Sequence, residues 1–237
     1  MRNIDRIAIQ ERGIPGMTLM ERAGEAVANL ILGSIYPRCV AVVTGKGNNA
    51  GDGFVVARLL RRAGCMVRLL MLAPPHELSG DALSVFHTLP QELDRILCSS
   101  GDEVALHLAG ADCIVDAILG TGVCGELRGI HADAVSAINN SGLTTVAVDI
   151  PSGLPSDAEY FDGHCVHADY TVTMGLPKLG MMQHPAAAFC GEVSIASLGF
   201  PGDLLKNPGP SRLSLVTPGG AWRILPHRAQ AGHKGTF

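Results

Sequence analysis

Several features are scarce in this 237-residue sequence. Aromatic residues make up 4% of the chain, charged residues 17%, and the formal net charge is −4. Because no strong positive charge covers the chain, a general nucleic-acid-binding protein is excluded as an expectation. No apolar run approaches the roughly 20 residues that cross a bilayer, and no apolar segment follows the polar N-terminus as in a signal peptide. We therefore expect a cytoplasmic protein without a membrane span.

The cysteines lack the spacing of a disulfide framework or a zinc site. Seven are present, an odd number, and no Cys-x-x-Cys pair occurs among them. Disulfide scaffolds and structural zinc sites use closer and more regular spacings. Several cysteines lie in apolar runs, where this residue usually behaves as a small buried hydrophobe. The pattern predicts reduced thiols.

The apolar residues, 47% of the chain, form short runs that alternate with helical stripes. Many runs are apolar on both faces, as in parallel strands covered on both sides. The alternation predicts a Rossmann-like three-layer α/β/α sandwich with a mostly parallel sheet. A Gly/Pro-rich stretch leaves antiparallel pairing open for the last two strands. The predicted strands are 39–44, 66–72, 112–119, 144–150, 169–174 and 192–197, and the predicted helices are 51–63, 81–89, 103–109 and 132–140.

The two ends of the chain differ from this alternating pattern. Thr18 and Glu21 have the spacing of a capping box, which predicts that a helix begins at Thr18. Residues 201–237 hold five basic residues, one acidic residue and five prolines. This composition indicates a linker or tail, with a basic binding arm as the weaker alternative. We place a first domain at 1–205 and a separate segment at 206–237.

A glycine-rich segment follows the first predicted strand, at residues 45–53. Its four glycines allow close backbone approach to a ligand, and the helix after it offers N–H groups to a phosphate. Ordinary βα loops run about 2–6 residues, so nine residues indicate a functional loop. The segment is not a P-loop. The acidic residue of a dinucleotide-binding fold, about 20 residues further on, is also missing, which disfavours a hydride-transferring oxidoreductase.

Two further polar clusters follow later strands. Asp116 precedes glycines at 120, 122 and 125, and Asp149 ends an apolar strand shortly before Ser152. In open parallel sheets, ligands bind beyond such strand ends. A half-buried acid there can exchange protons, and a structural role for either carboxyl is the alternative. The Asn, Asp and Ser oxygens, with backbone carbonyls, suit a hard cation, K⁺ or hydrated Mg²⁺ rather than Ca²⁺.

In this order, the clusters resemble the NAD(P)H-hydrate epimerase family, the YjeF N-terminal domain. The family's motifs Gly-x-Gly-Asn-Asn-x-Gly-Asp-Gly, Asp-x-x-x-Gly-Thr-Gly and Val-Asp-Ile-Pro-Ser-Gly match residues 45–53, 116–122 and 148–153. Residues 16–24 and 168–180 also look like the family, and the likeness covers about residues 1–200. One departure lies at 155–163, where the family usually carries an Asp-Thr-Gly element.

The resemblance implies an isomerase of nicotinamide nucleotide repair. Such an enzyme interconverts the R and S epimers of hydrated NADH and NADPH (NADHX and NADPHX). It implies Asp149 as the catalytic acid, a homodimer, and one K⁺ per subunit on Asn49, Asp116 and Ser152. Lys46 and Lys178 would pair with substrate phosphates or lie solvated on the surface. The implied substrate contacts are Asn48, Asn49, Ala50, Gly51, Asp52, Gly120, Thr121, Gly122, Val123, Cys124, Gly125, Glu126 and Asp149.

The C-terminal residues carry a second resemblance. Residues 225–228 and 233–237 look like the opening of the ADP-dependent NAD(P)H-hydrate dehydratase domain, which in many bacteria follows the epimerase. We therefore expect 206–237 to be a linker with the first residues of that domain, the remainder of which is missing here. Three alternatives stay open: an NAD(P)-dependent oxidoreductase, a non-catalytic dinucleotide-binding or RNA-associated module on the same fold, and an inactive epimerase domain.

Overall fold

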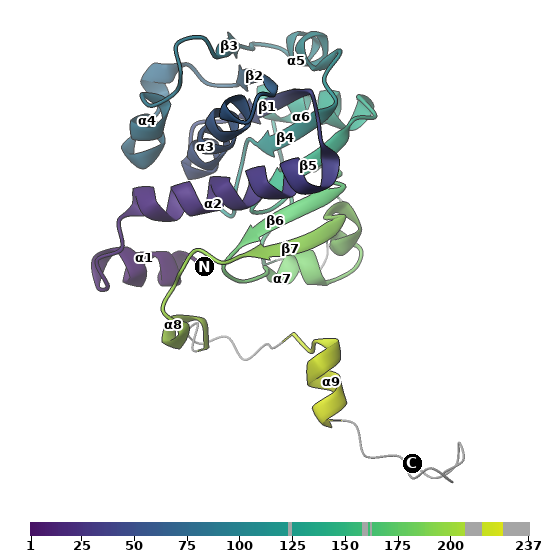
Figure 1. Ribbon diagram of the computed structural model, residues 1–237. Coiled ribbons are helices and arrows are strands. Elements are labelled where there is room, and N and C mark those ends of the chain that lie inside the picture. Colours follow the sequence, from purple (N-terminus) through teal and green to yellow (C-terminus); the bar gives the residue numbers. More distant parts are fainter. Residues whose placement is uncertain (123–124, 158–160, 162, 207–214, 225–237) are drawn as a thin grey trace.

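One sheet of seven strands organises the protein (Figure 1). The computed structural model describes residues 1–122, 125–157, 161, 163–206 and 215–224. The strand order is β3-β2-β1-β4-β5-β6-β7, and every neighbouring pair is parallel. The strands are β1 (Cys39–Thr44), β2 (Met66–Met71), β3 (Asp94–Leu97), β4 (Cys113–Ala117), β5 (Thr144–Val148), β6 (Tyr170–Met174) and β7 (Glu192–Ala196). The predicted α/β fold is confirmed, and antiparallel pairing of the last two strands is wrong.

Helices cover both faces of the sheet and make the outer layers of the sandwich (Figure 1). One face carries α1 (Arg2–Gln10), α2 (Gly16–Leu30), α3 (Asn48–Arg62) and α4 (Gly80–Phe86), and the other carries α5 (Gly101–Leu108) and α6 (Ile130–Asn140). The remaining short elements are η1 (Ile31–Ile35), η2 (Pro75–Glu77), α7 (Leu179–Met182), η3 (Ala186–Phe189), α8 (Gly202–Lys206) and α9 (Pro218–Ile224).

The central strand β1 shows why the strands read as continuous apolar runs. All six of its residues are buried. Val40 and Val42 belong to the core beneath α2 and α3, while Ala41 and Val43 belong to the core beneath α5 and α6. Side chains of a strand alternate between the two faces, so a strand covered on both sides needs apolar residues at every position.

Two elements and one helix start differ from the prediction. Helix α1 and strand β3 were not expected; β3 is an edge strand whose Asp94 and Arg95 are exposed, so it lacks an apolar signature. Helix α2 begins at Gly16 after Pro15, whose extended backbone forms the N-cap. Thr18 therefore lies inside the helix, and the predicted capping box is wrong.

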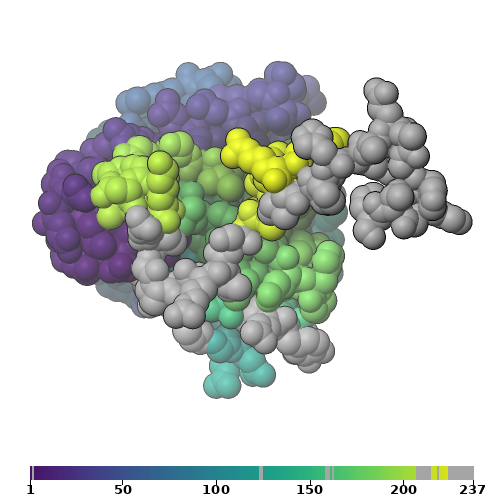
Figure 2. Space-filling model, turned by 90° about the horizontal axis from the view of Figure 1, so that it is seen from below, coloured from purple at the N-terminus to yellow at the C-terminus, as the bar shows by residue number. Residues whose placement is uncertain are grey.

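The chain returns to its N-terminus after the last strand. Seen from below, α8 lies beside α1 (Figure 2). An ion pair joins the two regions, with Arg12 Nη2 2.5 Å from Asp203 Oδ2. Among the described helices, none is long and apolar enough to cross a membrane.

The described cysteines behave as the sequence predicts. Six are free and buried, and burial raises the pKa of Cys113 and of Cys165 to about 12. Cys113 and Cys165 are therefore protonated at neutral pH and serve as packing groups. The seventh, Cys124, and residues 225–237, which carry the second resemblance, lie outside the described residues.

Candidate functional site

The strand order reverses between β1 and β4, and a cavity of about 550 Å³ opens at that reversal. Strand β2 lies on one side of β1 and β4 lies on its other side, so the connections after β1 and after β4 lead away from each other. This leaves a crevice between the carboxyl ends of β1 and β4. Gly45 follows β1 and donates its N–H to the carbonyl of Ala117 at the end of β4, at 3.4 Å. A side chain at Gly45 would collide with the carbonyl of Ile118. This glycine thus lets the first two polar clusters meet.

Most of the predicted contact residues reach this cavity. Ala50 and Gly51 are buried on the helix behind it, and Gly125 and Glu126 are exposed away from it. Val123 and Cys124 lie outside the described residues. The predicted residues that line the cavity are Asn48, Asn49, Asp52, Gly120, Thr121, Gly122 and Asp149.

The glycine-rich segment is shorter as a loop than predicted. Helix α3 begins at Asn48, so residues 48–53 are helical and only 45–47 connect β1 to the helix. The inference from a nine-residue loop is therefore wrong. A helix N-terminus therefore replaces the predicted loop at the cavity. This arrangement also favours an anionic ligand, because the positive end of the helix dipole lies at Asn48 and Asn49 on the cavity wall.

Asp116 lies fully buried beneath the cavity and is held by Ser152. Its Oδ2 accepts the backbone N–H of Ser152 at 2.8 Å, and its Oδ1 accepts the Ser152 hydroxyl at 2.6 Å and the N–H of Ile118 at 3.3 Å. Burial raises the pKa of Asp116 to about 6, against the opposing effect of the hydrogen bonds from Ser152 and Ile118. The predicted proximity of Asp116 and Ser152 is present.

The side chains of Asn49 and Ser152 both contact the Leu119 carbonyl above this pair. Asn49 Nδ2 donates to that carbonyl at 3.0 Å, and Ser152 Oγ lies 3.1 Å from it. The Ser152 hydroxyl proton belongs with the nearer Asp116 Oδ1, and Ser152 Oγ accepts the N–H of Leu119 at 2.9 Å. The hydroxyl, carbonyl and carboxylate oxygens of Ser152, Leu119 and Asp116 fit a hard cation, while Asn49 presents its amide nitrogen to this cluster.

The same residues do not suit a transition metal. Within the described ranges there is no group of three His, Cys, Asp or Glu side chains able to hold one. Within those ranges, too, no Lys or Arg forms an ion pair with Asp116. A buried carboxylate without a cationic side chain is compensated well by a bound monovalent cation. The residues present therefore fit K⁺.

Asp149 follows β5 in a left-handed backbone conformation, with φ of 69°. Residues other than Gly rarely adopt this conformation, because it strains the backbone. It persists only where contacts with the surrounding structure fix it. Here the N–H of Asp149 donates to the Val172 carbonyl at 2.8 Å, and the N–H of Met174 donates to Asp149 Oδ1 at 3.0 Å. The side chain is half-buried, as predicted, and lines the cavity.

Lys178 pairs with Asp149, which sequence reasoning missed. Its ammonium is buried and donates to Asp149 Oδ1, to Thr173 Oγ1 at 2.7 Å and to the Met174 carbonyl at 3.4 Å. Neither predicted role, phosphate contact or solvated surface residue, fits this position. Lys46 differs: it is exposed at the cavity rim and forms an ion pair with Glu77 at 2.8 Å.

Two more carboxyls face the same cavity, Asp52 from α3 and Asp5 from α1. Burial raises the pKa of Asp52 well above its usual range; the negative charges of Asp149 and Asp5 raise it further, and Lys178 opposes them. Burial also raises the pKa of Asp5, against the N-terminal amine. Asp52 was predicted as a substrate contact. Asp5 was missed because α1 was not predicted, although Ile4, Ile7 and Ala8 have the spacing of one helix face.

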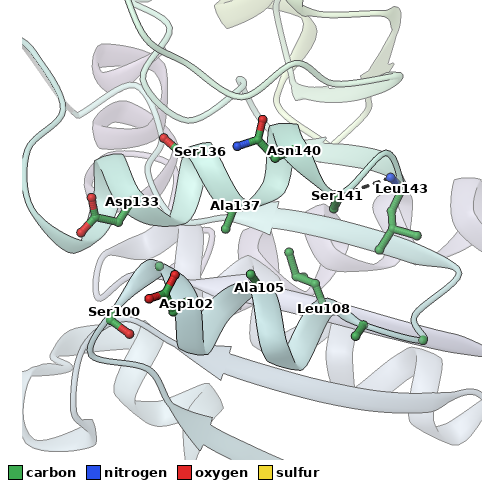
Figure 3. A pocket seen from close by; sticks show the side chains of 13 residues that line it. Ser100, Asp102, Ala105, Leu108, Asp133, Ser136, Ala137, Asn140, Ser141 and Leu143 are labelled. Carbon is green, nitrogen blue, oxygen red and sulfur yellow. Dashed lines mark hydrogen bonds between the residues drawn. The ribbon is translucent and has the colours of Figure 1, made fainter.

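A second hollow, of about 730 Å³, lies between α5 and α6 (Figure 3). Ala105 and Leu108 of α5 and Ala137 of α6 point toward one another across it. None of the three polar clusters contributes a residue to its wall. We assign the functional site to the smaller cavity, where the carboxyl groups and the α3 N-terminus converge.

Comparison with known proteins places the chain in a family. Residues 16–180 match the family described as YjeF-related protein N-terminus. The bifunctional NAD(P)H-hydrate repair enzyme Nnr of Moorella thermoacetica is 38% identical over an aligned length of 245 residues, gaps included, which covers 100% of this chain and 46% of the relative. The NAD(P)H-hydrate epimerase of Rhodopirellula baltica is 39% identical over 207 residues, which are 87% of this chain and 84% of the relative.

The chain spans about half the length of the bifunctional relatives that it matches, and most of the single-function relative. The crystal structure of yeast ynu0 has the same fold. Its TM-score is 0.68 at 22% identity, and the likeness covers 82% of this chain and 84% of the yeast chain.

Proposed function

The chain belongs to the family of YjeF-related protein N-termini, and from that membership and the cavity geometry we propose that it is an NAD(P)H-hydrate epimerase. It interconverts the R and S forms of NADHX and NADPHX, as part of nicotinamide nucleotide repair. The observation that carries the proposal is the Asp149 carboxyl, fixed by Lys178 and opening on a cavity that also holds the N-terminus of α3.

The reaction requires acid–base chemistry at one carbon. In the substrate, C6 of the reduced ring carries a hydroxyl and adjoins the ring nitrogen. Protonation of the hydroxyl lets the C6–O bond break and water leave, while the nitrogen lone pair forms an iminium. Water then adds to the other face of C6 and loses a proton. Asp149 is the catalytic residue for this exchange, because its carboxyl reaches the cavity and is oriented on two sides.

The dinucleotide lies along the wall formed by α3 and the segment after β4. Its diphosphate suits the α3 N-terminus, where the dipole and unpaired N–H groups attract negative charge. Backbone N–H groups of the glycine-containing segment add further contacts. The proposed contacts are the predicted residues that line the cavity, Asn48, Asn49, Asp52, Gly120, Thr121, Gly122 and Asp149.

One K⁺ per subunit is part of the proposal. Asn49, Asp116 and Ser152 would hold it, with the Leu119 carbonyl as a further oxygen. When bound, the ion would supply positive charge that compensates Asp116. The protein's part is to anchor the start of the 120–126 segment at Leu119, because positioning of the substrate accounts for much of the rate in such reactions.

The setting of the domain is also a proposal. We place the epimerase at 1–205 and a linker with the start of a dehydratase domain at 206–237. The support is that the family match ends at residue 180, while the bifunctional relatives are about twice as long. We further propose a cytoplasmic homodimer.

Proton NMR of a mixture of R and S NADHX tests the function. An S-specific dehydratase drains one epimer, and the protein is added with KCl or with tetramethylammonium chloride. The proposal expects the R form to disappear much faster with protein than spontaneously. Decay at the spontaneous rate, with bound dinucleotide detected, would instead identify a binding module.

A further inference from the structure

The two oxygens of Asp149 are not equivalent. Oδ1 accepts the N–H of Met174 and the ammonium of Lys178, whereas no hydrogen bond to Oδ2 is formed within the described ranges. The ammonium has three N–H groups, and they meet Asp149, Thr173 and the Met174 carbonyl. Lys178 is thus fully used in holding Asp149 as an ion-paired carboxylate. Such a group enters the reaction as a proton acceptor, so the proton donor must be another residue.

Asp52 is the cavity group best suited to donate. The other charged or titratable groups on the wall are Lys46, Asp5, Asp81 and His131. Lys46 is paired with Glu77 at the rim, and burial and the Lys46 charge lower the pKa of His131. Burial raises the pKa of Asp5 against the charge of the N-terminal amine, whereas it raises the pKa of Asp52 well above the usual range. Asp52 is half-buried, and its carboxyl has no hydrogen-bond or ion-pair partner in the part of the chain described.

The charges around Asp52 come from three other elements. Asp5 lies on α1, Asp149 follows β5, and Lys178 precedes α7; the two carboxylates and burial favour the protonated form of Asp52, and Lys178 opposes it. Pairs of carboxyls with separated proton affinities divide acid and base roles in many enzymes. The cavity therefore brings together one ion-paired carboxyl, Asp149, and one carboxyl without a partner among the described residues, Asp52, whose pKa burial raises.

We propose that Asp52 and Asp149 act as an acid–base pair on the two faces of the substrate ring, with Lys178 as the residue that positions Asp149. This inference rests on the proposed epimerase function. Asp52 gives its proton to the C6 hydroxyl, the C6–O bond breaks with its electron pair on oxygen, and water leaves. A second water forms the new C–O bond from the other face and gives a proton to Asp149 Oδ2. The reverse direction uses the same groups in exchanged roles.

The test follows both epimerisation and oxygen exchange in water enriched in ¹⁸O. With Asp149→Asn, Asp52 still removes and returns water on its own face. That variant therefore incorporates ¹⁸O into one epimer above the spontaneous rate without epimerising it. With Asp52→Asn, both epimerisation and that exchange are lost, by about 100-fold or more. Asp102→Asn on helix α5, outside the cavity, is the matched control.

The outcomes separate this inference from the function itself. If the unaltered protein does not epimerise, the proposed function fails. If it does epimerise and Asp52→Asn keeps its turnover within about threefold, only the role of Asp52 fails. Loss of oxygen exchange in Asp149→Asn as complete as in Asp52→Asn would also overturn the two-face pair. Asp52→Glu keeps an acid and should recover part of the turnover, which a loss of folding would not explain.

The positioning role of Lys178 is tested by the separate effects of its substitution on kcat and on KM. Lys178→Met should lower kcat about 10–100-fold with little change in KM, because a loosened Asp149 is misoriented. Lys178→Arg should restore part of the loss. An equal rise in KM with unchanged kcat would show that Lys178 contacts substrate instead of positioning Asp149.

Discussion

Asp116 and Asp149 stand at the ends of neighbouring strands, yet the protein treats their charges differently. Asp116 is fully buried, and its oxygens receive hydrogen bonds from Ser152 and Ile118. Asp149 is half-buried, opens on the cavity and has an ammonium beside it. A position at the end of a strand therefore does not by itself determine the burial or the partners of a carboxyl group. The partner distinguishes them: the hydrogen bonds to Asp116 bring no cationic side chain, whereas Lys178 pairs its ammonium with Asp149.

Removing the charge at the cavity should have the largest effect. Asp149→Asn cannot accept a proton, so turnover should fall about 10²–10⁴-fold in the coupled NMR assay. The melting temperature should also fall, because Lys178 is left buried beside a neutral amide. Turnover close to that of the unaltered protein would remove Asp149 from the mechanism.

A double variant sharpens the comparison at the level of stability. Breaking a buried ion pair from one side can cost about 3–5 kcal/mol, whereas replacing both partners is often near neutral. Asp149→Asn with Lys178→Met should therefore melt higher than Asp149→Asn alone, although it stays inactive. Urea unfolding of the four proteins in this cycle measures the coupling. Strictly additive effects would show that the pair does not interact as the geometry indicates.

Asp116 should respond to ions, unlike Asp149. A ligand at 100 times its Kd stabilises the folded state by about 2.7 kcal/mol. The unaltered protein should melt higher in KCl than in tetramethylammonium chloride, and Asp116→Asn should lose that difference. Asp149→Asn should keep it. A K⁺ effect that survives in Asp116→Asn would place the ion elsewhere.

The pH dependence of stability should reveal Asp52. Because its folded-state pKa is raised, the folded protein binds the proton more tightly than the unfolded chain. Stability from this group is thus present at low pH and is lost as pH rises from about 4 through the raised value. Asp52→Asn should match the unaltered protein at pH 4 and melt higher at pH 8. A variant that melts lower at pH 8 would contradict the burial of an ionisable group.

The smallest effect belongs to the ion pair at the cavity rim. Lys46 and Glu77 are both exposed, and solvent and salt screen such pairs. Glu77→Gln should leave the melting temperature unchanged within the error of the measurement. A clear loss would mean that this pair holds the rim in place more strongly than the exposed geometry suggests.

The sequence indicated those parts of the fold whose residues carry a local signal. Strands such as β4 and β5 are apolar on both faces, and the Asp116 and Ser152 motifs each end such a strand, so their meeting across 36 residues followed from parallel topology. Lys178 was different. It lies 29 residues from Asp149, and no periodicity states which buried charges will pair.

The elements that were missed carry weak or polar patterns. Strand β3 has four residues and two exposed charges, which read like a loop. Helix α1 is short, and its one apolar face, with Ile4, Ile7 and Ala8, was overlooked, so its contribution of Asp5 to the cavity was missed. The predicted helix began at residue 51, whereas α3 begins at Asn48. The prediction was late because residues 48–53 have the composition of a loop, although they form the first turns of the helix.

The reversed strand order also shapes how the chain folds as it is made. Strand β1 pairs early with β2, but its other edge waits for β4, which is completed only at Ala117. At about 5–20 residues per second of synthesis, that edge stays open for roughly 4–15 seconds. It belongs to a strand with no exposed residue, the kind of edge that other chains can extend. The edge of β1 that later borders the cavity is thus an apolar edge that a growing chain leaves unpaired while residues 45–117 are made.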